Sequence, residues 1–362
     1  MAKEKITRLC MRILISELSA NHHDTALALI AYAAALRPEA IAVAAPPLWE
    51  GLYRSLSEVD GFIPYEGREN FRRFMDRVKS FRPTHIVHVT AYGKEPLALA
   101  SAYSDAAQVG VIHDLAKLRR FSWIQWRMMR YMRFFWVLRP GLYERLPERY
   151  RMRSDYLWTG VYPASLEAQI PAVQGAEGKV YICIPGRVEY KRRDYRMLLE
   201  VLDRLEGREQ FRFILLGPAA ARHSDYADFF SQIQERGWEE IFISFSDIVP
   251  FPLYHAYLRM SQAVLALIHP NRYREHRDYL DSQISGAFPM AQAHRKPLFL
   301  HRSFAGEAEL EDCSYFYDTS DDLVRLLKSL AAGSLDAGHL YQGSWFSFEE
   351  GLRRFRRGLE AG

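Results

Sequence analysis

Residues 179–205 read KVYICIPGRVEYKRRDYRMLLEVLDRL, a stretch that contains the parts of a ligand-binding α/β unit. The apolar run Lys179–Ile184 has the length of a strand that is buried on both faces. Apolar residues then recur at helical spacing from Leu198 to Leu205. Between them lies PGRVEYKRRD, in which Gly186 permits a sharp turn of the backbone. We therefore expect a strand, a glycine turn, a basic loop and a helix.

The loop after Gly186 carries four cations, Arg187, Lys191, Arg192 and Arg193. They follow the carboxyl end of the expected strand, which is where open α/β sheets bind ligands. An arginine donates two parallel hydrogen bonds to a phosphate, and a lysine adds a point charge. The pattern therefore predicts a diphosphate site. The alternative is a solvated basic loop that precedes an ordinary helix.

The rest of the chain repeats the alternation of strand and helix, which predicts an α/β fold with parallel sheets. A helix is expected at Phe71–Phe81. In the second half, the Gly217-Pro218 step marks the turn after a strand. The expected strands are Arg12–Ser16, Ala40–Ala44, two more within residues 85–112, Phe211–Leu216, Ile241–Phe245, Ala263–Ile268 and Pro297–Leu300.

Length and composition exclude several classes of protein. The 362 residues are enough for two domains, and 49% hydrophobic residues exclude a disordered chain. The three cysteines form no CxxC pair, which argues against a disulfide scaffold or a zinc site. A net charge of +4 suits anionic ligands but does not indicate nucleic acid. No apolar run is long enough to cross a bilayer, so we expect a cytoplasmic protein.

The second half resembles the carboxyl-terminal domain of the family 4 glycosyltransferases. The similarity lies in PGRVEYK, in LLGP, in FSDIVPFPLYHAYLRMSQAVLALIHP and in SGAFPMAQAHRKPLFL. It implies the GT-B architecture, in which two Rossmann-like α/β/α domains face each other across a cleft. It also implies transfer of a sugar from a nucleotide diphosphate sugar, with retention at the anomeric carbon and without a metal or other cofactor.

The resemblance also implies a domain plan. Residues 1–165 are expected to form the acceptor-side domain, and residues 166–340 the nucleotide-sugar-binding domain. Residues 341–362 are expected to form a helix that crosses back to the first domain. Prolines, glycines and weak periodicity place the linker at Ser154–Gly178.

Site residues follow from the same resemblance. In the first half, IVHV and a second strand ending in His113-Asp114 match strands beside the cleft, so these two residues are the catalytic candidates. A histidine there handles a proton near neutral pH, whereas the alternative is a histidine that satisfies a turn carbonyl. Neighbouring His22 and His23 are expected to be structural. The donor-binding candidates are Gly186, Arg187, Lys191, Arg192, Gly217, Asp247, Ser282, Ser285 and Gly286.

The chain departs from the family pattern at two places. The first turn has Ser19, Ala20 and Asn21 where relatives place paired glycines. The two glutamates of the last donor loop correspond to Ser282 and Met290, neither of which supplies a carboxylate. Hydroxyl, amide and backbone N–H groups of DSQISGAFPM remain for a sugar or phosphate. The alternative is a loop that has lost donor binding.

Residues 117–139 hold seven cations and no acid. On a helix, Arg127, Arg130 and Arg133 fall on one side, and Phe135 and Trp136 on the other. A basic face with tryptophans at its border is typical of a helix on anionic lipid. The alternative is a helix packed within the first domain with its arginines in water.

These observations predict a transferase that moves a hexose-type sugar to a glycan or lipid-linked acceptor, in surface polysaccharide, lipopolysaccharide or glycolipid biosynthesis. Its expected location is the cytoplasm, peripheral on the inner face of the cell membrane. Loss of the two glutamates motivates an alternative, a catalytically inactive GT-B protein that binds a nucleotide or a partner enzyme. A nucleotide-sugar epimerase is a third option, disfavoured because no acidic pair is identifiable near the donor.

Overall fold

The computed structural model describes residues 11–119, 122–218, 224–336 and 338–361, and the chain divides into two compact units. The first unit contains Met1–Gln169 together with Ser347–Gly362, and the second contains Ile170–Phe346. Each unit is built on its own parallel sheet.

In the described part of the first unit, seven strands form a parallel sheet in the order β3-β2-β1-β4-β5-β6-β7. Alternate residues face opposite sides, so Leu14 and Ile86 pack on one side against Phe74 and Val78 of α3. The strands are β1 (Arg12–Ser16), β2 (Ala40–Ala45), β3 (Gly61–Pro64), β4 (His85–His88), β5 (Ala107–Val111), β6 (Phe134–Val137) and β7 (Ser154–Tyr156).

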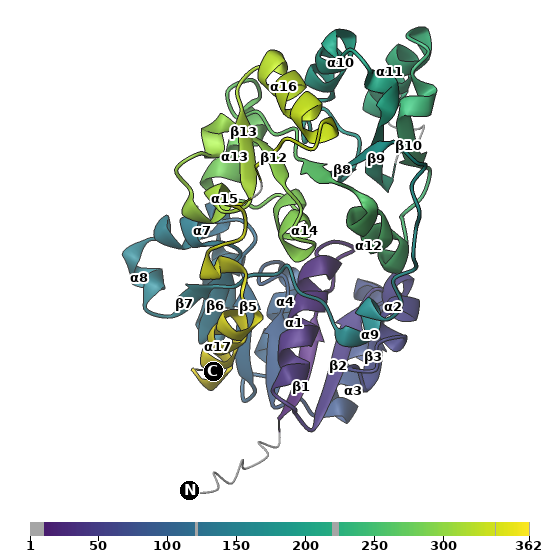
Figure 1. Cartoon of the computed structure of the whole chain (residues 1–362). Coiled ribbons are helices and arrows are strands. Elements are labelled where there is room, and N and C mark those ends of the chain that lie inside the picture. Colours follow the sequence, from purple (N-terminus) through teal and green to yellow (C-terminus); the bar gives the residue numbers. More distant parts are fainter. Residues whose placement is uncertain (1–10, 120–121, 219–223, 337, 362) are drawn as a thin grey trace, which may run out of the picture. The chain divides into compact units, whose positions relative to one another are not determined.

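Helices cover both faces of this sheet, and α1 and α17 lie side by side on the face turned toward the viewer (Figure 1). The helices are α1 (His23–Ala35), α2 (Glu50–Arg54), α3 (Phe71–Phe81), α4 (Lys94–Ala102), α5 (Ala116–Arg119), α6 (Trp123–Tyr131), α7 (Pro140–Glu144), α8 (Glu148–Arg151), α9 (Ala164–Glu167) and α17 (Phe348–Glu360).

The described part of the second unit has a six-stranded parallel sheet in the order β10-β9-β8-β11-β12-β13. Its strands are β8 (Val180–Pro185), β9 (Phe211–Pro218), β10 (Phe242–Phe245), β11 (Ala263–Leu265), β12 (Leu298–His301) and β13 (Ser314–Tyr317). Its helices are α10 (Tyr195–Arg204), α11 (Ser224–Glu235), α12 (Phe251–Met260), α13 (Arg274–Asp281), α14 (Ala287–Ala293), α15 (Ala308–Glu311) and α16 (Ser320–Ala331).

One core fills the side of this sheet against which α10 and α16 pack, with Ile182, Leu199 and Leu323 among its fully or nearly fully buried members. Both helices begin at side-chain caps. Asp194 accepts a hydrogen bond from the backbone of Met197, and Thr319 forms a capping box with the third residue of α16. These caps explain why the apolar periodicity of the sequence becomes helix at these positions.

Two glycines allow α17 to lie directly on aromatic rings of the first unit. A Cβ at Gly351 would overlap the Tyr32 ring, and one at Gly358 would overlap the Trp136 ring. Phe355, between them on the helix, stacks on both rings with centroid separations of 5.8 and 5.3 Å. The contact depends on side-chain volume, and no larger residue fits at either glycine without movement of a ring.

Ion pairs hold the same helix to the edge of the sheet. Asp155 on β7 is paired with Arg354, whose guanidinium also lies 3.8 Å from the Tyr156 ring centroid. Arg357 lies 3.3 Å from the other oxygen of Asp155. Because Asp155 is buried, its charge requires these partners.

The prediction of one helix across residues 117–139 is wrong beyond Tyr131, although α5 and α6 are helical. The chain leaves the helical conformation at Met132, and Phe134–Val137 form the fully buried strand β6. Aromatic and β-branched residues suit a strand covered on both faces, and this preference overrides the helical spacing. Phe134 and Trp136 are therefore core residues. Residues 120–121 lie outside the described part of the chain.

Other elements differ less from expectation. The strands β3 and β13, each four residues long, were not predicted. Ser154–Tyr156, expected to open the linker, is the edge strand β7.

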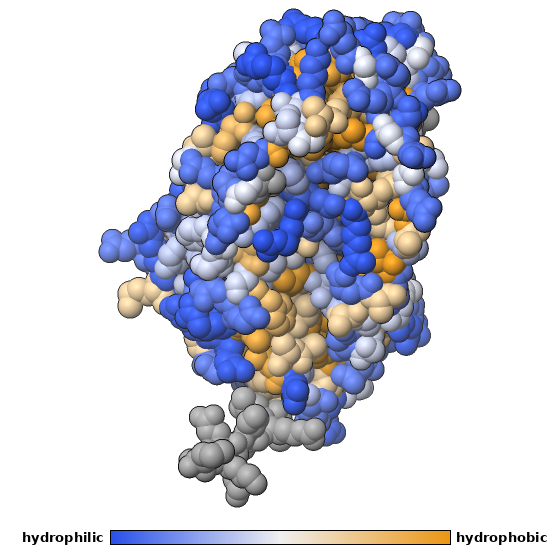
Figure 2. Space-filling model, in the orientation of Figure 1, coloured by the Kyte–Doolittle hydropathy of each residue, from blue (hydrophilic) through white to orange (hydrophobic). Residues whose placement is uncertain are grey.

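Figure 2 shows hydrophobic residues over part of the first unit, bordered by hydrophilic residues. Among the described residues, no helix is both long and apolar enough to cross a membrane.

The packing of α17 predicts that Gly358→Ala destabilises the protein by about 1–3 kcal/mol, because the added methyl group meets the buried Trp136 ring. Gly51→Ala is the matched control: it also lies in a helix, and a Cβ there meets nothing within 4 Å. The control should be neutral or stabilising by up to about 1 kcal/mol. Denaturant unfolding measures both changes. Equal stability of the two variants would contradict the proposed packing.

Candidate functional site

The strand order places a point of reversal at the carboxyl edge of each sheet. In the first unit, β1 connects toward β2 on one side and β4 lies on its other side; in the second unit, β8 lies between β9 and β11. Ligands of open parallel sheets bind outside the carboxyl ends of the strands at this reversal. The residues that follow β1, β4 and β5, and those that follow β8 and β11, are therefore the candidate site residues.

The turn after β8 depends on two glycines. Gly186 has a φ of 110°, a conformation that other residues rarely adopt. A Cβ at Gly217 on β9 would overlap the carbonyl of Gly186. Gly217 therefore allows the two chain segments to approach each other. Each glycine was predicted in the turn after its own strand, and their mutual contact was not predicted.

The structure brings three of the four predicted cations of this loop together around one acid. Glu189 lies 2.9 Å from Arg192, 3.5 Å from Lys191 and 3.9 Å from Arg187. Burial alone would raise the pKa of Glu189, but the three cations outweigh it and lower that pKa. The sequence analysis missed this residue, although an acid inside a basic loop is a visible signal of internal pairing. All three cations keep more than half of their side-chain surface exposed.

A buried polar network lies beneath the loop. Asp194 accepts hydrogen bonds from His269 Nδ1 at 2.7 Å and from Arg272 at 3.0 Å, and His269 Nε2 lies 2.9 Å from the Tyr317 hydroxyl. Burial would raise the pKa of Asp194, yet its hydrogen bonds, that with His269 foremost, lower it to about 2. The network therefore holds a charged carboxylate in the interior.

The same network joins the loops after β8 and β11. The backbone N–H of Asp194 donates to the carbonyl of Leu267 at 2.8 Å. Leu267 is fully buried and has a φ of 50°, which is unusual for a leucine. Backbone strain of this kind concentrates at functional sites. The two loops are thus fixed together at the carboxyl edge of the second sheet.

The remaining donor-binding candidates lie at three places in the second unit. Ser285 accepts a hydrogen bond from Arg193 at 3.1 Å and is buried. Gly286 precedes α14 and has open space where a Cβ would point. Ser282 is buried at the end of α13, where its hydroxyl donates to the Asp278 carbonyl at 3.4 Å. Asp247 is exposed after β10 and accepts from Ser246.

The positions that correspond to the family's paired glutamates are interior positions here. Met290 is 5% exposed and lies within α14, and Ser282 is 4% exposed. Neither presents a charged group to a ligand. Three nearby acids, Glu275, Asp278 and Asp281, lie on α13.

In the first unit, Glu17 directly follows β1 and is completely buried. It accepts hydrogen bonds from the backbone and hydroxyl of Ser19 and from the Thr90 hydroxyl, the latter at 2.6 Å. Burial raises the pKa of Glu17 to about 7, although these hydrogen bonds oppose the shift. An acid that changes charge near neutral pH is a candidate functional group. Glu17 was not among the site residues predicted from the sequence.

His113 lies two residues after β5, at the same carboxyl edge of the sheet as Glu17. Its Nε2 atom is 2.7 Å from the Val89 carbonyl, and its ring stacks on His22 with centroids 3.7 Å apart. Burial, followed by the charge of His22, lowers the pKa of His113 well below the usual value. Because a carbonyl only accepts, Nε2 carries the proton and Nδ1 is the basic nitrogen.

Asp114 and the paired histidines have distinct local roles. Asp114 accepts from the backbone of Ala116 at 2.9 Å and so supports the start of α5. His23 is buried, with Nδ1 2.6 Å from the Tyr53 hydroxyl, as expected of a structural residue. His22 stacks on His113, a contact that was not predicted.

The surface of α6 keeps part of the expected basic and aromatic character. Trp123 and Trp126 are 54% and 50% exposed. Arg127 lies 4.8 Å from the Trp123 ring centroid, and Arg130 lies 5.2 Å from that of Trp126. The opposite side of α6, with Met128 and its neighbours, belongs to the core. The helix therefore packs and also presents a cationic aromatic surface.

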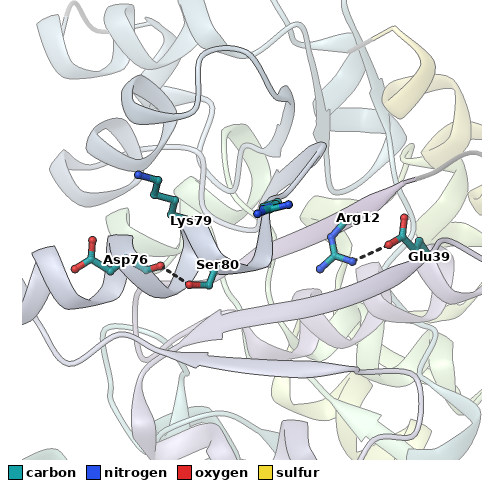
Figure 3. A pocket seen from close by; sticks show the side chains of 6 residues that line it. Arg12, Glu39, Asp76, Lys79 and Ser80 are labelled. Carbon is teal, nitrogen blue, oxygen red and sulfur yellow. Dashed lines mark hydrogen bonds and ion pairs between the residues drawn. The ribbon is translucent and has the colours of Figure 1, made fainter.

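A hollow of about 660 Å³ lies at the opposite, amino-terminal edge of the first sheet (Figure 3). It is lined by Arg12, Glu39, Asp76, Lys79, Ser80 and Arg82. Arg12 is already paired with Glu39 at 2.8 Å, and the Ser80 hydroxyl donates to the Asp76 carbonyl. Its position away from the carboxyl ends of the strands makes it a poor candidate for the ligand site.

Within the described residues, no group of three or more His, Cys, Asp or Glu side chains is arranged to hold a metal ion. Cys183 and Cys313 are both free and buried. Burial raises the pKa of each thiol to about 12, so both are protonated at neutral pH. The prediction that the reaction needs no metal rests on the cations of the second unit.

Comparison with known proteins shows the fold. No protein-family model matches the sequence, and no curated protein matches it. Among solved structures, HepE of Anabaena in complex with UDP is 14% identical over 97% of this chain and 100% of that chain, with a TM-score of 0.64. A glycosyltransferase from Rickettsia africae is 13% identical over 98% and 100%, with a TM-score of 0.61.

A putative UDP-N-acetylglucosamine 2-epimerase from Listeria monocytogenes is also similar, at 11% identity over 97% of this chain and 96% of that chain, with a TM-score of 0.62. At these identities the likeness concerns architecture alone. The two parallel α/β units of this chain have the GT-B fold, as predicted.

Proposed function

We propose that this protein is a family 4-like glycosyltransferase that takes a hexose-type sugar from a nucleotide diphosphate sugar. The observation that carries the proposal is the gathering of Arg187, Lys191 and Arg192 beside the glycine turn that follows β8. This turn lies at the carboxyl end of the sheet, where a parallel α/β unit binds nucleotides. The second unit is then the donor domain and the first is the acceptor domain.

The chemistry follows from the charges. Departure of the sugar leaves negative charge on the diphosphate, which Arg187 and Lys191 neutralise without a metal ion. Gly186 lets the backbone approach the phosphates, and Asp247, Ser282, Ser285 and Gly286 remain the proposed donor contacts. His113, with Asp114 beside it, acts on the acceptor proton or a sugar hydroxyl through Nδ1. We expect retention at the anomeric carbon.

The acceptor is proposed to be a glycan or a lipid-linked glycan in surface polysaccharide, lipopolysaccharide or glycolipid synthesis. Such an acceptor is consistent with a protein that works in the cytoplasm on the inner face of the membrane. The exposed tryptophans and arginines of α6 provide the surface for this contact.

A second candidate is a GT-B protein that binds a nucleotide or a partner enzyme without catalysis. The observation that favours it is the burial of Ser282 and Met290 at the positions of the missing glutamates. A panel of nucleotide diphosphate sugars tests both functions, because a specific ligand stabilises only the folded state. A donor that raises the melting temperature and is consumed supports the transferase. Stabilisation without consumption, whatever acceptor is present, supports the binding protein.

The phosphate site makes a direct prediction. Arg187→Ala and Lys191→Ala should each weaken binding of the nucleotide diphosphate by about 1.5–3 kcal/mol, because each removes a charge-assisted contact. Titration calorimetry measures the change. Arg204→Ala, at the far end of α10 and paired with Asp321, is the control and should bind normally. Unchanged affinity in both loop variants would remove the proposed phosphate site.

His113→Ala should lower turnover far more than donor affinity, since its Nδ1 acts on reacting groups. Steady-state kinetics and calorimetry separate the two effects. His85→Ala is a control at the amino end of β4, where the histidine contacts only Thr84 among the described hydrogen bonds. Normal turnover of the His113→Ala enzyme would show that His113 has only a structural role, through its hydrogen bond to the Val89 carbonyl.

The α6 surface predicts reversible binding to anionic vesicles, because each basic residue near such a surface contributes about 1 kcal/mol. Reversing Arg127, Arg130 and Arg133 to glutamate should abolish sedimentation with phosphatidylglycerol vesicles, and raised salt should release the wild-type protein.

A matched triple reversal of Arg72, Arg73 and Arg77 on α3 changes the net charge equally. The structure exposes no tryptophan on that helix, so this control should still sediment. A folded α6 variant that sediments like the wild type would show that the membrane contact lies elsewhere.

A further inference from the structure

The loop after β8 contains a fourth cation whose environment differs from that of the other three. Arg193 is only 5% exposed. Its guanidinium donates to the carbonyls of Arg192 and Pro185 at 2.7 and 3.0 Å and to the Ser285 hydroxyl at 3.1 Å. All three acceptors are neutral. A buried charge is unfavourable unless an opposite charge compensates it.

No carboxylate in the described part of the chain forms an ion pair with Arg193. Its sequence neighbour Asp194 is bound by the side chains of His269, Arg272 and Tyr273 and by the first turn of α10. Glu189 is bound by the exposed cations instead. Among the described residues, the positive charge of Arg193 therefore has no carboxylate in direct contact.

The guanidinium also retains capacity to donate. Its Nε atom is buried and has no hydrogen-bond partner among the described residues. A Cβ at Gly186 would lie 3.3 Å from Nη2, so the glycine turn lies directly against the guanidinium. Arg193 thus lies against the Gly186 turn, which follows β8 where the strand order reverses between β8 and β11.

The charge of Arg193 affects the pKa of a neighbouring histidine, His276. Burial, His269 and then Arg193 lower the pKa of His276 to about 4. The His276 Nδ1 atom accepts the backbone N–H of His269 at 2.9 Å, which keeps the imidazole neutral and in place. No second buried cation therefore competes with Arg193 from this residue at neutral pH.

We infer that Arg193 supplies the buried positive charge of an anion site at the Gly186 turn, and that the ligand is a phosphate or diphosphate group. The inference rests on the proposed function for the identity of the biological ligand, a nucleotide diphosphate. In this arrangement the exposed cations, partly neutralised by Glu189, attract the ligand, and Arg193 with Ser285 supplies the fixed charge that holds it.

Arg193→Met removes the charge and keeps much of the side-chain volume. It should weaken binding of inorganic pyrophosphate and of UDP roughly ten- to hundredfold in calorimetry. Arg193→Lys should restore part of the affinity, because it keeps the charge and loses the planar fork. If Arg193 only filled space, the affinity would not fall in the order wild type, Arg193→Lys, Arg193→Met. The salt dependence of pyrophosphate binding would then also be the same in Arg193→Met as in the wild type.

Arg212→Met is the matched control. Like that of Arg193, its guanidinium donates to neutral acceptors among the described residues, the carbonyls of Glu209 and Phe211 at 2.8 and 2.7 Å, but it lies at the amino end of β9. This variant should bind pyrophosphate and UDP like the wild type. A loss of affinity equal to that of Arg193→Met would overturn the inference, because it would reflect general destabilisation.

A second variant covers the case in which Arg193→Met does not fold. Ser285→Asp places a carboxylate against Arg193 and supplies the missing counterion within the chain. It should raise the melting temperature and abolish binding of pyrophosphate. Unchanged pyrophosphate binding by this folded variant would overturn the inference.

The outcomes separate this inference from the proposed function. Wild-type protein that binds pyrophosphate through Arg193, but no nucleotide diphosphate sugar, would keep the anion site and contradict the transferase. Normal binding of UDP by folded Arg193→Met would contradict the inference and leave the transferase standing. Failure of the wild type to bind pyrophosphate and UDP alike would overturn the anion site.

Discussion

The close approach of Gly217 to the carbonyl of Gly186 is the constraint on which the candidate donor site depends. It allows the chain to turn tightly after β8. The following loop then lies where the strand order reverses, between β8 and β11. The loop then places exposed cations around Glu189 and one buried cation, Arg193, beneath the turn. A larger residue at either glycine would move the loop and separate the cations from the turn.

Much of the fold could be predicted from the sequence, because long apolar runs and their turns are local signals. The strand before Gly186 and the helix Phe71–Phe81 appear where expected. The error at Phe134–Val137 arose from spacing that suits both a helix and a buried strand. The segment forms a strand because it pairs with β5 and β7 in the interior of the sheet, and these contacts are distant in the sequence.

The candidate site could be predicted in part. The sequence placed the cations of the loop and His113 near strand ends, because both follow apolar runs. It could not give the pairing of Glu189 with three cations, the burial of Arg193 or the ionisation of Glu17. These depend on side chains brought together from separate strands and on their distance from water. Such properties follow only from the folded chain.

The most direct test of the account is a crystal structure of the protein with a bound nucleotide diphosphate. The account predicts the diphosphate at the Gly186 turn, with its oxygens within hydrogen-bond distance of Arg187 or Lys191 and next to the Arg193 guanidinium. A diphosphate bound at another place, or a Gly186 turn that leaves these cations in contact with protein groups alone, would contradict it.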